Sequence, residues 1–288
     1  MCGIAGYVQA SPEARILGEM LDRLSHRGPD GEGAWQGTSG EWQIALGHRR
    51  LSILDLSGGA QPMSAADGSV KLTYNGELYN FRELRKALET RGVICRTRSD
   101  TEVLSHHVAA HWTAGLDSLS GMFAFALWDR GRRTLLLARD RAGIKPLYYA
   151  RLPGGGIAFA SELTALLQHT GVRREMSPGG LQSYFFSDYF HPPTTLIEGV
   201  LKLPPGHFVE WTDGRMSEPA LYVRRPLGSA DRPRVMKPGV LARDLWTRLG
   251  HAVESQLVAD VPVGAFVSGG LDSSCVATLA QERVSGRL

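Results

Sequence analysis

Apolar residues recur at intervals of four in several segments, a pattern that predicts amphipathic helices with one buried face. The predicted helices cover 13–24, with Ile16, Met20 and Leu24 on one face, then 81–91 before the stop signal Gly92, and a segment starting near Asp100. The longest stripe lies toward the C-terminal end and comprises Leu241, Leu245, Leu249, Val253 and Leu257.

Shorter apolar runs predict strands. The runs MFAFALW and TLLLA are apolar at consecutive positions, which is typical of strands buried on both faces. Strands are predicted over 2–9, 42–47, 49–54, 70–74, 122–128, 134–138, 147–150 and 157–160. Helices at both ends of this strand-rich part favour stacked sheets covered by helices, an α+β domain.

A change in composition predicts a domain boundary. Residues 224–240 hold three prolines and two glycines and few apolar residues, so we expect a linker over 226–240 between domains at 2–225 and 241–288. In the second domain VPVGAFV predicts a strand, SGGLDSS a turn and CVATLAQERV a helix.

Composition narrows the class of protein. Hydrophobic residues make up 43% and charged residues 21%, values typical of a globular protein, and the net charge is only +3 without a long basic run. We therefore expect no nucleic-acid partner. The chain has no signal peptide at its start and no long apolar span, so no membrane association is expected. Its three cysteines fit a reducing compartment, which favours the cytoplasm, and they predict no metal site.

Cys2 is a candidate nucleophile because removal of Met1 would give it a free α-amine beside its thiol. The reference pKa of an α-amine is about 7.7–8.0, so this amine can act as the base for its own side chain. From Cys2 alone, a small buried hydrophobic residue in a first strand is the more common interpretation.

The motifs MCGIAG, HRGPDGEG, GHRRLSILD, YNGELYN, TRSDTEV, GMFAFALWD and ARDRAGIKPLYY change that interpretation. In this order, and followed by SGGLDS, they resemble glutamine-hydrolysing asparagine synthetases. The resemblance implies an N-terminal-nucleophile αββα glutaminase domain of four layers, with two antiparallel sheets between helices. It also implies that a truncated α/β PP-loop ATP-pyrophosphatase segment follows.

Free glutamine presents a carboxylate, an ammonium group and an amide. Arg50 is expected to hold the carboxylate with its planar fork of donors, whereas Arg49 points to the opposite face of its strand. The resemblance implies that Asn75 and Gly76, predicted at a turn, form the oxyanion hole for the intermediate formed by Cys2. It further places Glu77 and Asp100 at the ammonium group, with backbone contacts at Leu51 and Ile53. From sequence alone, Asn-Gly more often marks a hairpin turn and Asp100 a helix N-cap.

The loop SGGLDSS resembles the PP-loop of ATP pyrophosphatases. Its glycines let the backbone approach a pyrophosphate, its serines add donors, and the following helix N-terminus favours an anion. The predicted ATP-binding residues are Phe266, Ser268, Gly269, Gly270, Leu271, Asp272, Ser273 and Ser274. In the complete enzyme we expect ATP and Mg²⁺, whereas the glutaminase half needs no cofactor.

The predicted function is therefore glutamine hydrolysis that supplies ammonia for ATP-dependent amidation of aspartate to asparagine. The family's remaining synthetase part lies beyond Leu288, so we expect a fragment, a split gene product or a chain that awaits a partner, either a second copy or a synthetase domain. One alternative is amidation of another carboxylate in cell-surface or natural-product synthesis. A sugar-phosphate-dependent amidotransferase is disfavoured by SGGLDS, and a degenerate regulatory module by the intact glutamine-site motifs.

Overall fold

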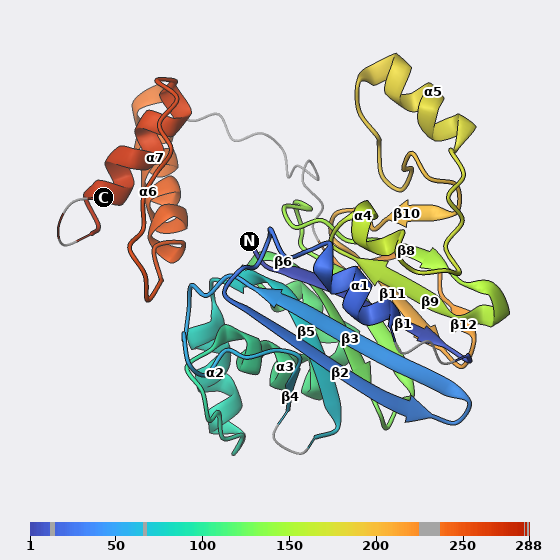
Figure 1. Cartoon of the computed structure of the whole chain (residues 1–288). Helices are drawn as coiled ribbons and strands as arrows, with labels where there is room; N and C mark the ends of the chain where they lie inside the picture. The colour runs from blue at the N-terminus through green and yellow to red at the C-terminus, as the bar shows by residue number, and fades with distance from the viewer. Residues whose placement is uncertain (12–14, 66–67, 225–236, 285, 287) are drawn as a thin grey trace. The chain divides into compact units, whose positions relative to one another are not determined.

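The structure is a computed structural model that describes residues 1–11, 15–65, 68–224, 237–284, 286 and 288. Contacts divide the chain into two compact units. The first comprises Met1–Ser52 and Ser57–Arg224, and the second comprises Ile53–Leu56 and Arg225–Leu288. Both sheets belong to the first unit (Figure 1).

The strands of the first unit form two antiparallel sheets. The first sheet has the order β10-β8-β9-β1-β3-β2 and the second the order β12-β11-β7-β6-β5-β4, with β13 beside β11. The strands of the first sheet are β1 (Gly3–Gln9), β2 (Gly31–Ser39), β3 (Trp42–Arg50), β8 (Tyr148–Arg151), β9 (Ile157–Ala160) and β10 (Val200–Lys202). Those of the second are β4 (Met63–Ser64), β5 (Val70–Leu78), β6 (Gly121–Asp129), β7 (Thr134–Arg139), β11 (His207–Thr212), β12 (Arg215–Met216) and β13 (Ala220–Leu221).

The inner faces of the two sheets share one apolar core. Ile4 and Leu46 from the first sheet and Ala124 and Leu137 from the second are all fully buried there. Every residue of β7 is buried, as are the last seven residues of β6, which confirms the prediction that these apolar runs are covered on both faces.

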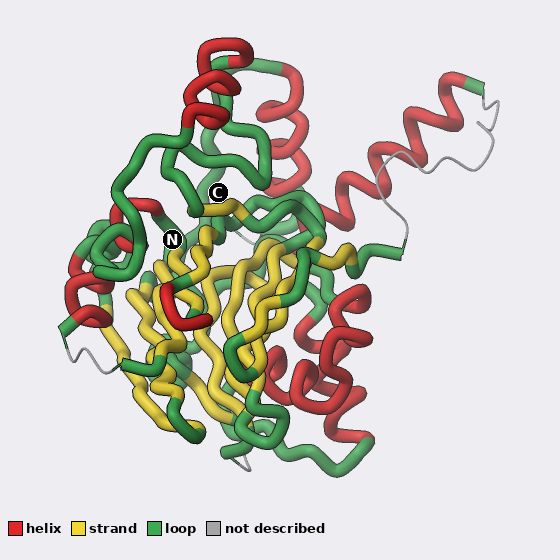
Figure 2. The backbone as a smooth tube through the Cα atoms, turned by 90° about the vertical axis from the view of Figure 1, so that its right-hand side faces the viewer, coloured by secondary structure: helices red, strands yellow, loops and turns green. Residues whose placement is uncertain are grey.

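Helices cover the outer faces of this sandwich (Figure 2). On the first sheet Ile16, Met20 and Leu24 pack as the stripe predicts, in a core shared with Ala5 and Leu166. The helices on this side are α1 (Ile16–Asp22) and α4 (Leu163–Leu166), and those on the second sheet are α2 (Phe81–Thr90) and α3 (Asp100–His111). The predicted four-layer αββα arrangement is confirmed.

The remaining helices of the first unit are short, and sequence analysis did not predict them. They are the 3-10 helices η1 (Trp112–Ser118) and η2 (Pro153–Gly155) and the helix α5 (Pro178–Ser187). Helix α5 stands at the edge of the unit in Figure 1, and its side chains Phe185 and Phe186 are exposed.

Two predictions about strands are wrong. The segments predicted as separate strands over 42–47 and 49–54 are replaced by the single strand β3, which ends at Arg50. Strand β2 is missing from the predicted strands because it is an edge strand rich in glycine. Its side chains alternate between half-buried and exposed, so it has no apolar pattern.

The second unit is formed by α6 (Pro238–Ser255) and α7 (Leu271–Gln281), which pack through Val253, Leu279 and Ala280. The helix α6 begins inside the predicted linker, most of which lies outside the described residues. VPVGAFV is not a strand, which contradicts the prediction. The described part of this unit offers it no neighbouring strand for hydrogen bonding.

Candidate active site

Cys2 lies just before β1, a central strand of the first sheet, and backbone groups hold its side chain. The N–H of Leu51 donates to Cys2 Sγ at 3.4 Å, and the thiol lies 3.6 Å from the carbonyl oxygen of Leu51. The carbonyl oxygen of Cys2 accepts a hydrogen bond of 2.9 Å from Arg27 Nε. The half-buried thiol is thus fixed at one end of the sheet.

Burial keeps the Cys2 thiol protonated. It raises the pKa of Cys2 above the usual value, whereas the hydrogen bond from Leu51 and the nearby terminal amine lower that pKa. Burial also lowers the pKa of the Met1 amine, which favours its neutral form. A thiol in these surroundings needs a base, and an amine of lowered pKa is suited to that role.

The HRGPDGEG segment forms hydrogen bonds that border this site, a role that sequence analysis did not predict. Asp30 Oδ2 accepts from the N–H of Ser52 at 2.8 Å, and the N–H of Asp30 donates to the carbonyl oxygen of Arg50 at 3.0 Å. Arg27 also pairs with Glu162 at 2.9 Å. The turn therefore fixes the segment 50–52 against Cys2.

The two neighbouring arginines of β3 have different surroundings. Arg49 pairs with Asp22 at 3.0 Å and with Glu32 at 2.6 Å, and it donates to the carbonyl oxygen of Leu21, so it is a structural residue of the helix-covered face. Arg50 is the last residue of β3 and directly precedes Leu51, which brings it to the end of the sheet where Cys2 lies.

Asn75 and Gly76 lie inside β5, not at a turn, which corrects the prediction. The Asn75 side chain is 1% exposed, and among the described residues its Nδ2 has no hydrogen-bond partner. A buried amide donor left unpaired is costly, so a group that accepts from it is expected at this position.

Gly76 pairs with Phe123 of β6, and a Cβ on Gly76 would overlap the backbone carbonyl oxygen of Met122 and lie 2.8 Å from the Cα of Phe123. Only glycine fits this close approach of two strands. The glycine therefore serves strand packing as well as access to its N–H.

Two hydrogen bonds join β3 to β5 across the sandwich. The hydroxyl of Thr73 donates to the carbonyl oxygen of Gly47 at 2.9 Å, and His48 Nε2 lies 3.1 Å from the carbonyl oxygen of Tyr74. Burial lowers the pKa of His48 to about 4, so the ring is neutral at pH 7 and donates from Nε2. These contacts, which sequence analysis missed, tie the strand of Asn75 to the strand that leads to Leu51.

The two predicted carboxylates lie close to each other. Asp100 Oδ2 accepts from the hydroxyl of Tyr74 at 3.0 Å and from the N–H of Leu78 at 2.9 Å. Burial raises the pKa of Glu77 to about 8, and the neighbouring Asp100 adds to this shift. Burial raises the pKa of Asp100 as well, against the effect of its hydrogen bonds.

Asp100 does not cap its helix. The N-cap of α3 is Ser99, whose side chain accepts from the N–H of Thr101, and Asp100 is the first helical residue. The alternative that Asp100 serves as the N-cap is therefore wrong. Its carboxylate turns toward β5 instead, where Tyr74 and Leu78 bind it.

Ile53 groups with the second unit rather than with Arg50 and Leu51. Its carbonyl oxygen accepts from the N–H of Asp260 at 3.0 Å, and the N–H of Asp55 donates to Asp260 Oδ2 at 2.7 Å.

The loop predicted to bind ATP precedes and opens α7. Gly270 is the N-cap and Gly269 has a φ of +82°. The hydroxyls of Ser273 and Ser274 donate to the carbonyl oxygen of Gly270 at 3.1 and 2.8 Å, and the side chain of Phe266 is fully exposed. These residues fit a phosphate group at a helix N-terminus, and all of residues 268–274 except Ser273 are exposed.

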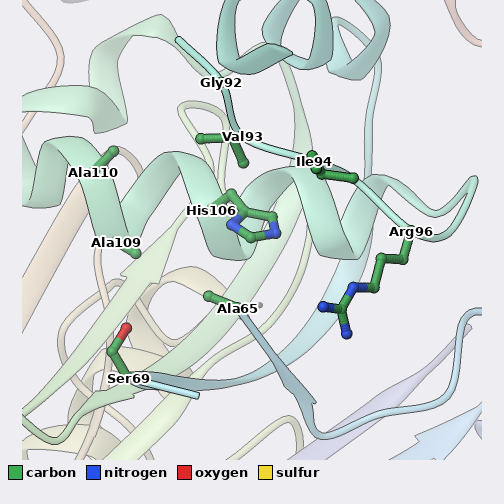
Figure 3. A pocket seen from close by; sticks show the side chains of 9 residues that line it. All are labelled: Ala65, Ser69, Gly92, Val93, Ile94, Arg96, His106, Ala109 and Ala110. Atoms are coloured by element: carbon green, nitrogen blue, oxygen red, sulfur yellow. The ribbon is translucent and has the colours of Figure 1, made fainter. Parts of the chain in front are cut away.

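A cavity of about 540 Å³ lies elsewhere, between α3 and the segment 92–96 (Figure 3). His106, Ala109 and Ala110 line it from α3, and Val93 and Ile94 line it from the segment 92–96. None of the predicted glutamine-site residues lines this cavity.

Among the residues that the structure describes, no group of three His, Cys, Asp or Glu side chains is arranged to hold a metal ion. No helix in the described part is long and apolar enough to span a membrane.

Comparison with protein families gives two matches. Residues 1–222 match the family of glutamine amidotransferase domains, and residues 244–288 match asparagine synthase. The glutamine-site residues, from Cys2 to Asp100, all fall within the first match.

Several curated relatives are similar along nearly the whole chain. Asparagine synthetase [glutamine-hydrolyzing] 3 of Bacillus subtilis (strain 168) is 36% identical over 287 residues, which cover 97% of this chain and 45% of the relative. Asparagine synthetase [glutamine-hydrolyzing] 2 of Arabidopsis thaliana is 33% identical over 97% of this chain and 42% of its own length. Amidase chry2 of Gibberella zeae is 32% identical over 99% of this chain and 43% of its own length. The chain thus spans less than half the length of these relatives.

Solved structures share the fold. Glutamine phosphoribosylpyrophosphate amidotransferase from B. subtilis superposes with a TM-score of 0.56 at 23% identity, covering 98% of this chain and 64% of that one. An allosteric regulatory enzyme of purine biosynthesis gives a TM-score of 0.59 at 22% identity, covering 98% of this chain and 63% of that one. At this identity the likeness concerns the N-terminal-nucleophile fold alone.

Proposed function

Because the chain belongs to the family of glutamine amidotransferase domains, we propose that it hydrolyses glutamine to glutamate and ammonia with Cys2 as the nucleophile. The observation that carries this proposal is the buried Asn75 amide, whose Nδ2 has no partner in the described part of the chain. It lies beside Gly76, on a strand that His48 and Thr73 join to the strand leading to Leu51.

The proposed reaction begins when removal of Met1 leaves the α-amine on Cys2. This amine takes the thiol proton, and the sulfur attacks the amide carbon of glutamine. The Nδ2 of Asn75 and the N–H of Gly76 stabilise the oxyanion that forms. The amine returns its proton to the departing ammonia, and water then hydrolyses the thioester to glutamate.

Substrate binding in this proposal uses opposite charges. Arg50 pairs with the α-carboxylate, since it lies one residue before Leu51, whose backbone holds the Cys2 thiol. Glu77 and Asp100 hold the α-ammonium group. Burial, and in addition repulsion from Asp100, raises the pKa of Glu77 to about 8, and a cation that binds between the two carboxylates relieves that repulsion.

Mass spectrometry with a glutamine-like diazoketone tests this proposal. The mature chain should lack Met1, and the reagent should modify Cys2 while sparing Cys95 and Cys275. Glutamine should protect Cys2 from modification. Labelling of another cysteine, or full glutaminase activity in Cys2→Ala, would show that Cys2 is not the nucleophile.

For the fate of the ammonia, we propose ATP-dependent amidation of aspartate, because residues 244–288 match asparagine synthase. Loop 268–274 would hold phosphate groups of ATP with Mg²⁺ through its backbone N–H groups and serine hydroxyls. Another carboxylate acceptor is the second candidate, since a relative named as an amidase matches the chain over a similar length. Release of pyrophosphate that depends on aspartate, and not on other carboxylates, would distinguish the two.

A synthetase partner follows from this proposal. Leu241 and Leu245 of α6 are more than half exposed, and such apolar faces commonly bind protein. We propose that the part of the relatives absent from this chain covers them. The three free cysteines favour a reducing compartment such as the cytoplasm for this activity.

A further inference from the structure

The loop 140–145 lies between β7 and β8, and buried charged side chains hold its backbone. Asp140 is fully buried, and its carboxylate accepts hydrogen bonds from four backbone N–H groups. These donors are Phe123 at 3.1 Å, Ala142 at 3.1 Å, Ile144 at 2.9 Å and Lys145 at 3.0 Å. A carboxylate with four such donors fixes the loop against β6.

Arg139 fixes the far end of the same loop. Its buried guanidinium donates from Nε to the carbonyl oxygen of Lys145 at 2.7 Å and from Nη1 to the carbonyl oxygen of Leu203 at 2.6 Å. Both backbone groups of Lys145 are therefore held by buried charged side chains. Holding both backbone groups of one residue fixes the point from which its side chain extends.

The position fixed in this way lies at the candidate active site. Asp140 Oδ2 binds the N–H of Phe123, and Phe123 pairs with Gly76 across β5 and β6. In the other sheet β1 and β8 are both antiparallel to β9, so they run in the same direction. Lys145 precedes β8 and Cys2 precedes β1, which puts both at the same end of that sheet.

The Lys145 side chain is buried, and it lies close enough to Cys2 and Glu77 for the charges to act on one another. Lys145 is 5% exposed, and in the described part of the chain its ammonium group forms no ion pair. Burial raises the pKa of Cys2 and that of Glu77, and the charge of Lys145 opposes both rises. Burial lowers the pKa of Lys145 itself, while Cys2 and Glu77 raise it. The charged groups that act on Cys2, Lys145 or the terminal amine are Arg27, Asp30, Glu77 and Asp140.

We propose that Lys145 is a positioning residue for the nucleophile: its ammonium charge, fixed by loop 140–145, favours the thiolate form of Cys2 and the carboxylate form of Glu77. Lys145 touches no reacting atom in this scheme and acts through those two groups. The inference deepens the proposed glutamine hydrolysis and rests on it.

The test measures the alkylation of Cys2 by iodoacetamide between pH 6 and 10, followed by peptide mass spectrometry so that Cys95 and Cys275 are counted separately. The chains compared are the unaltered protein, Lys145→Met, Lys145→Arg and, as a matched control on the exposed face of α2, Lys86→Met. Glutaminase turnover is recorded over the same range.

In Lys145→Met we expect the midpoint of Cys2 alkylation to rise by about one pH unit, because the positive charge that favours the thiolate is removed. Alkylation and turnover at pH 7 should fall about tenfold, and both should recover toward pH 9. Lys145→Arg and Lys86→Met should keep the midpoint of the unaltered chain.

An unchanged midpoint in a folded Lys145→Met chain would overturn the inference, because a merely structural lysine does not shift that profile. Where the neutral variant loses its native melting transition, Lys145→Arg decides: a midpoint raised by about one unit in that folded variant would also overturn it. A shifted alkylation profile in a chain that never hydrolyses glutamine would contradict the proposed function and leave this inference standing. Glutamine turnover together with an unshifted alkylation profile in Lys145→Met would contradict this inference and leave the proposed function standing.

Discussion

The two units carry similar apolar stripes but bury them to different extents. Ile16, Met20 and Leu24 of the first unit are at most 3% exposed, whereas Leu241 and Leu245 of the second are 52% and 62% exposed. The periodic pattern predicted a helix in both places. The pattern does not show which residues pack against the helix, because those residues come from elements far away in the sequence.

The polar groups differ in the same way. In the first unit Asn75 and Asp100 are buried on strands and helices that are hydrogen-bonded to each other. In the second unit Ser268 and Asp272 of the predicted ATP loop are exposed. Preorganised donors in a buried site stabilise developing charge far better than donors in water. The candidate glutamine site is thus built from buried groups, whereas most polar groups of the loop are exposed to solvent.

The largest effect is expected for Asn75→Ala. Loss of one oxyanion donor commonly lowers kcat by about 10²–10³-fold, and the Nδ2 of Asn75 forms no hydrogen bond in the described residues that its removal would break. The KM for glutamine should change little, since the charge it binds forms only in the transition state. A steady-state assay separates these two constants. A rise in KM at unchanged kcat would assign Asn75 to substrate binding instead.

A matched pair of substitutions tests the difference in burial between the two units. Leu46→Ala in β3 removes a fully buried side chain and should lower the free energy of unfolding by about 2–5 kcal/mol. Leu245→Ala in α6 should change it by less than about 0.5 kcal/mol, because the side chain is mostly exposed. Urea unfolding of the two variants measures both values. A large loss in Leu245→Ala would mean that this face is covered in solution by a second copy or by another segment.

Sequence patterns located much of the first unit for clear physical reasons. Strands β6 and β7 are buried on both faces, so their apolar runs are long and distinct. Strand β2 has only half-buried side chains on one face, so its sequence resembles a loop. VPVGAFV is an apolar run that does not form a strand. An apolar run becomes a strand only where a neighbouring strand can pair with it.

Part of the candidate site was likewise accessible from sequence. The motifs that carry the resemblance predicted Cys2, Arg50 and Asn75 as site residues. His48 bonds to Tyr74 and Tyr74 bonds to Asp100, and no local spacing along the chain reveals such contacts. The one signal for Lys145 was its place in the motif ARDRAGIKPLYY, which carried the resemblance but no assigned role.

The hydrogen bond from His48 to Tyr74, which joins the two sheets, should make the stability of the fold depend on pH. His48 has a pKa of about 4 in the folded chain because it is buried, against about 6.5 when exposed. The folded state therefore binds fewer protons, and its stability is full above about pH 6.5 and falls as the pH drops toward 4, by about 3 kcal/mol for this group. Urea midpoints at pH 7, 5.5 and 4.5 measure the loss. His48→Gln should be less stable at pH 7 but less sensitive to acid, and equal acid sensitivity in both chains would contradict this assignment.

The smallest effect is expected from removing the second unit. A chain ending at Arg224 keeps Cys2, Arg50, Asn75 and Asp100 with the sheets that hold them, so its kcat for glutamine hydrolysis should stay within about twofold of that of the whole chain. Its KM should rise by a few-fold, because Ile53 and Asp55 lose the hydrogen bonds they form with Asp260, and Ile53 is a predicted backbone contact of glutamine. Asp260→Ala in the whole chain removes the side-chain bond to Asp55 alone and should reproduce part of that rise. A shortened chain with a much lower kcat would contradict the view that the first unit alone holds Cys2, Asn75 and Asp100 in place. An unchanged KM in both chains would show that Ile53 does not contribute to glutamine binding.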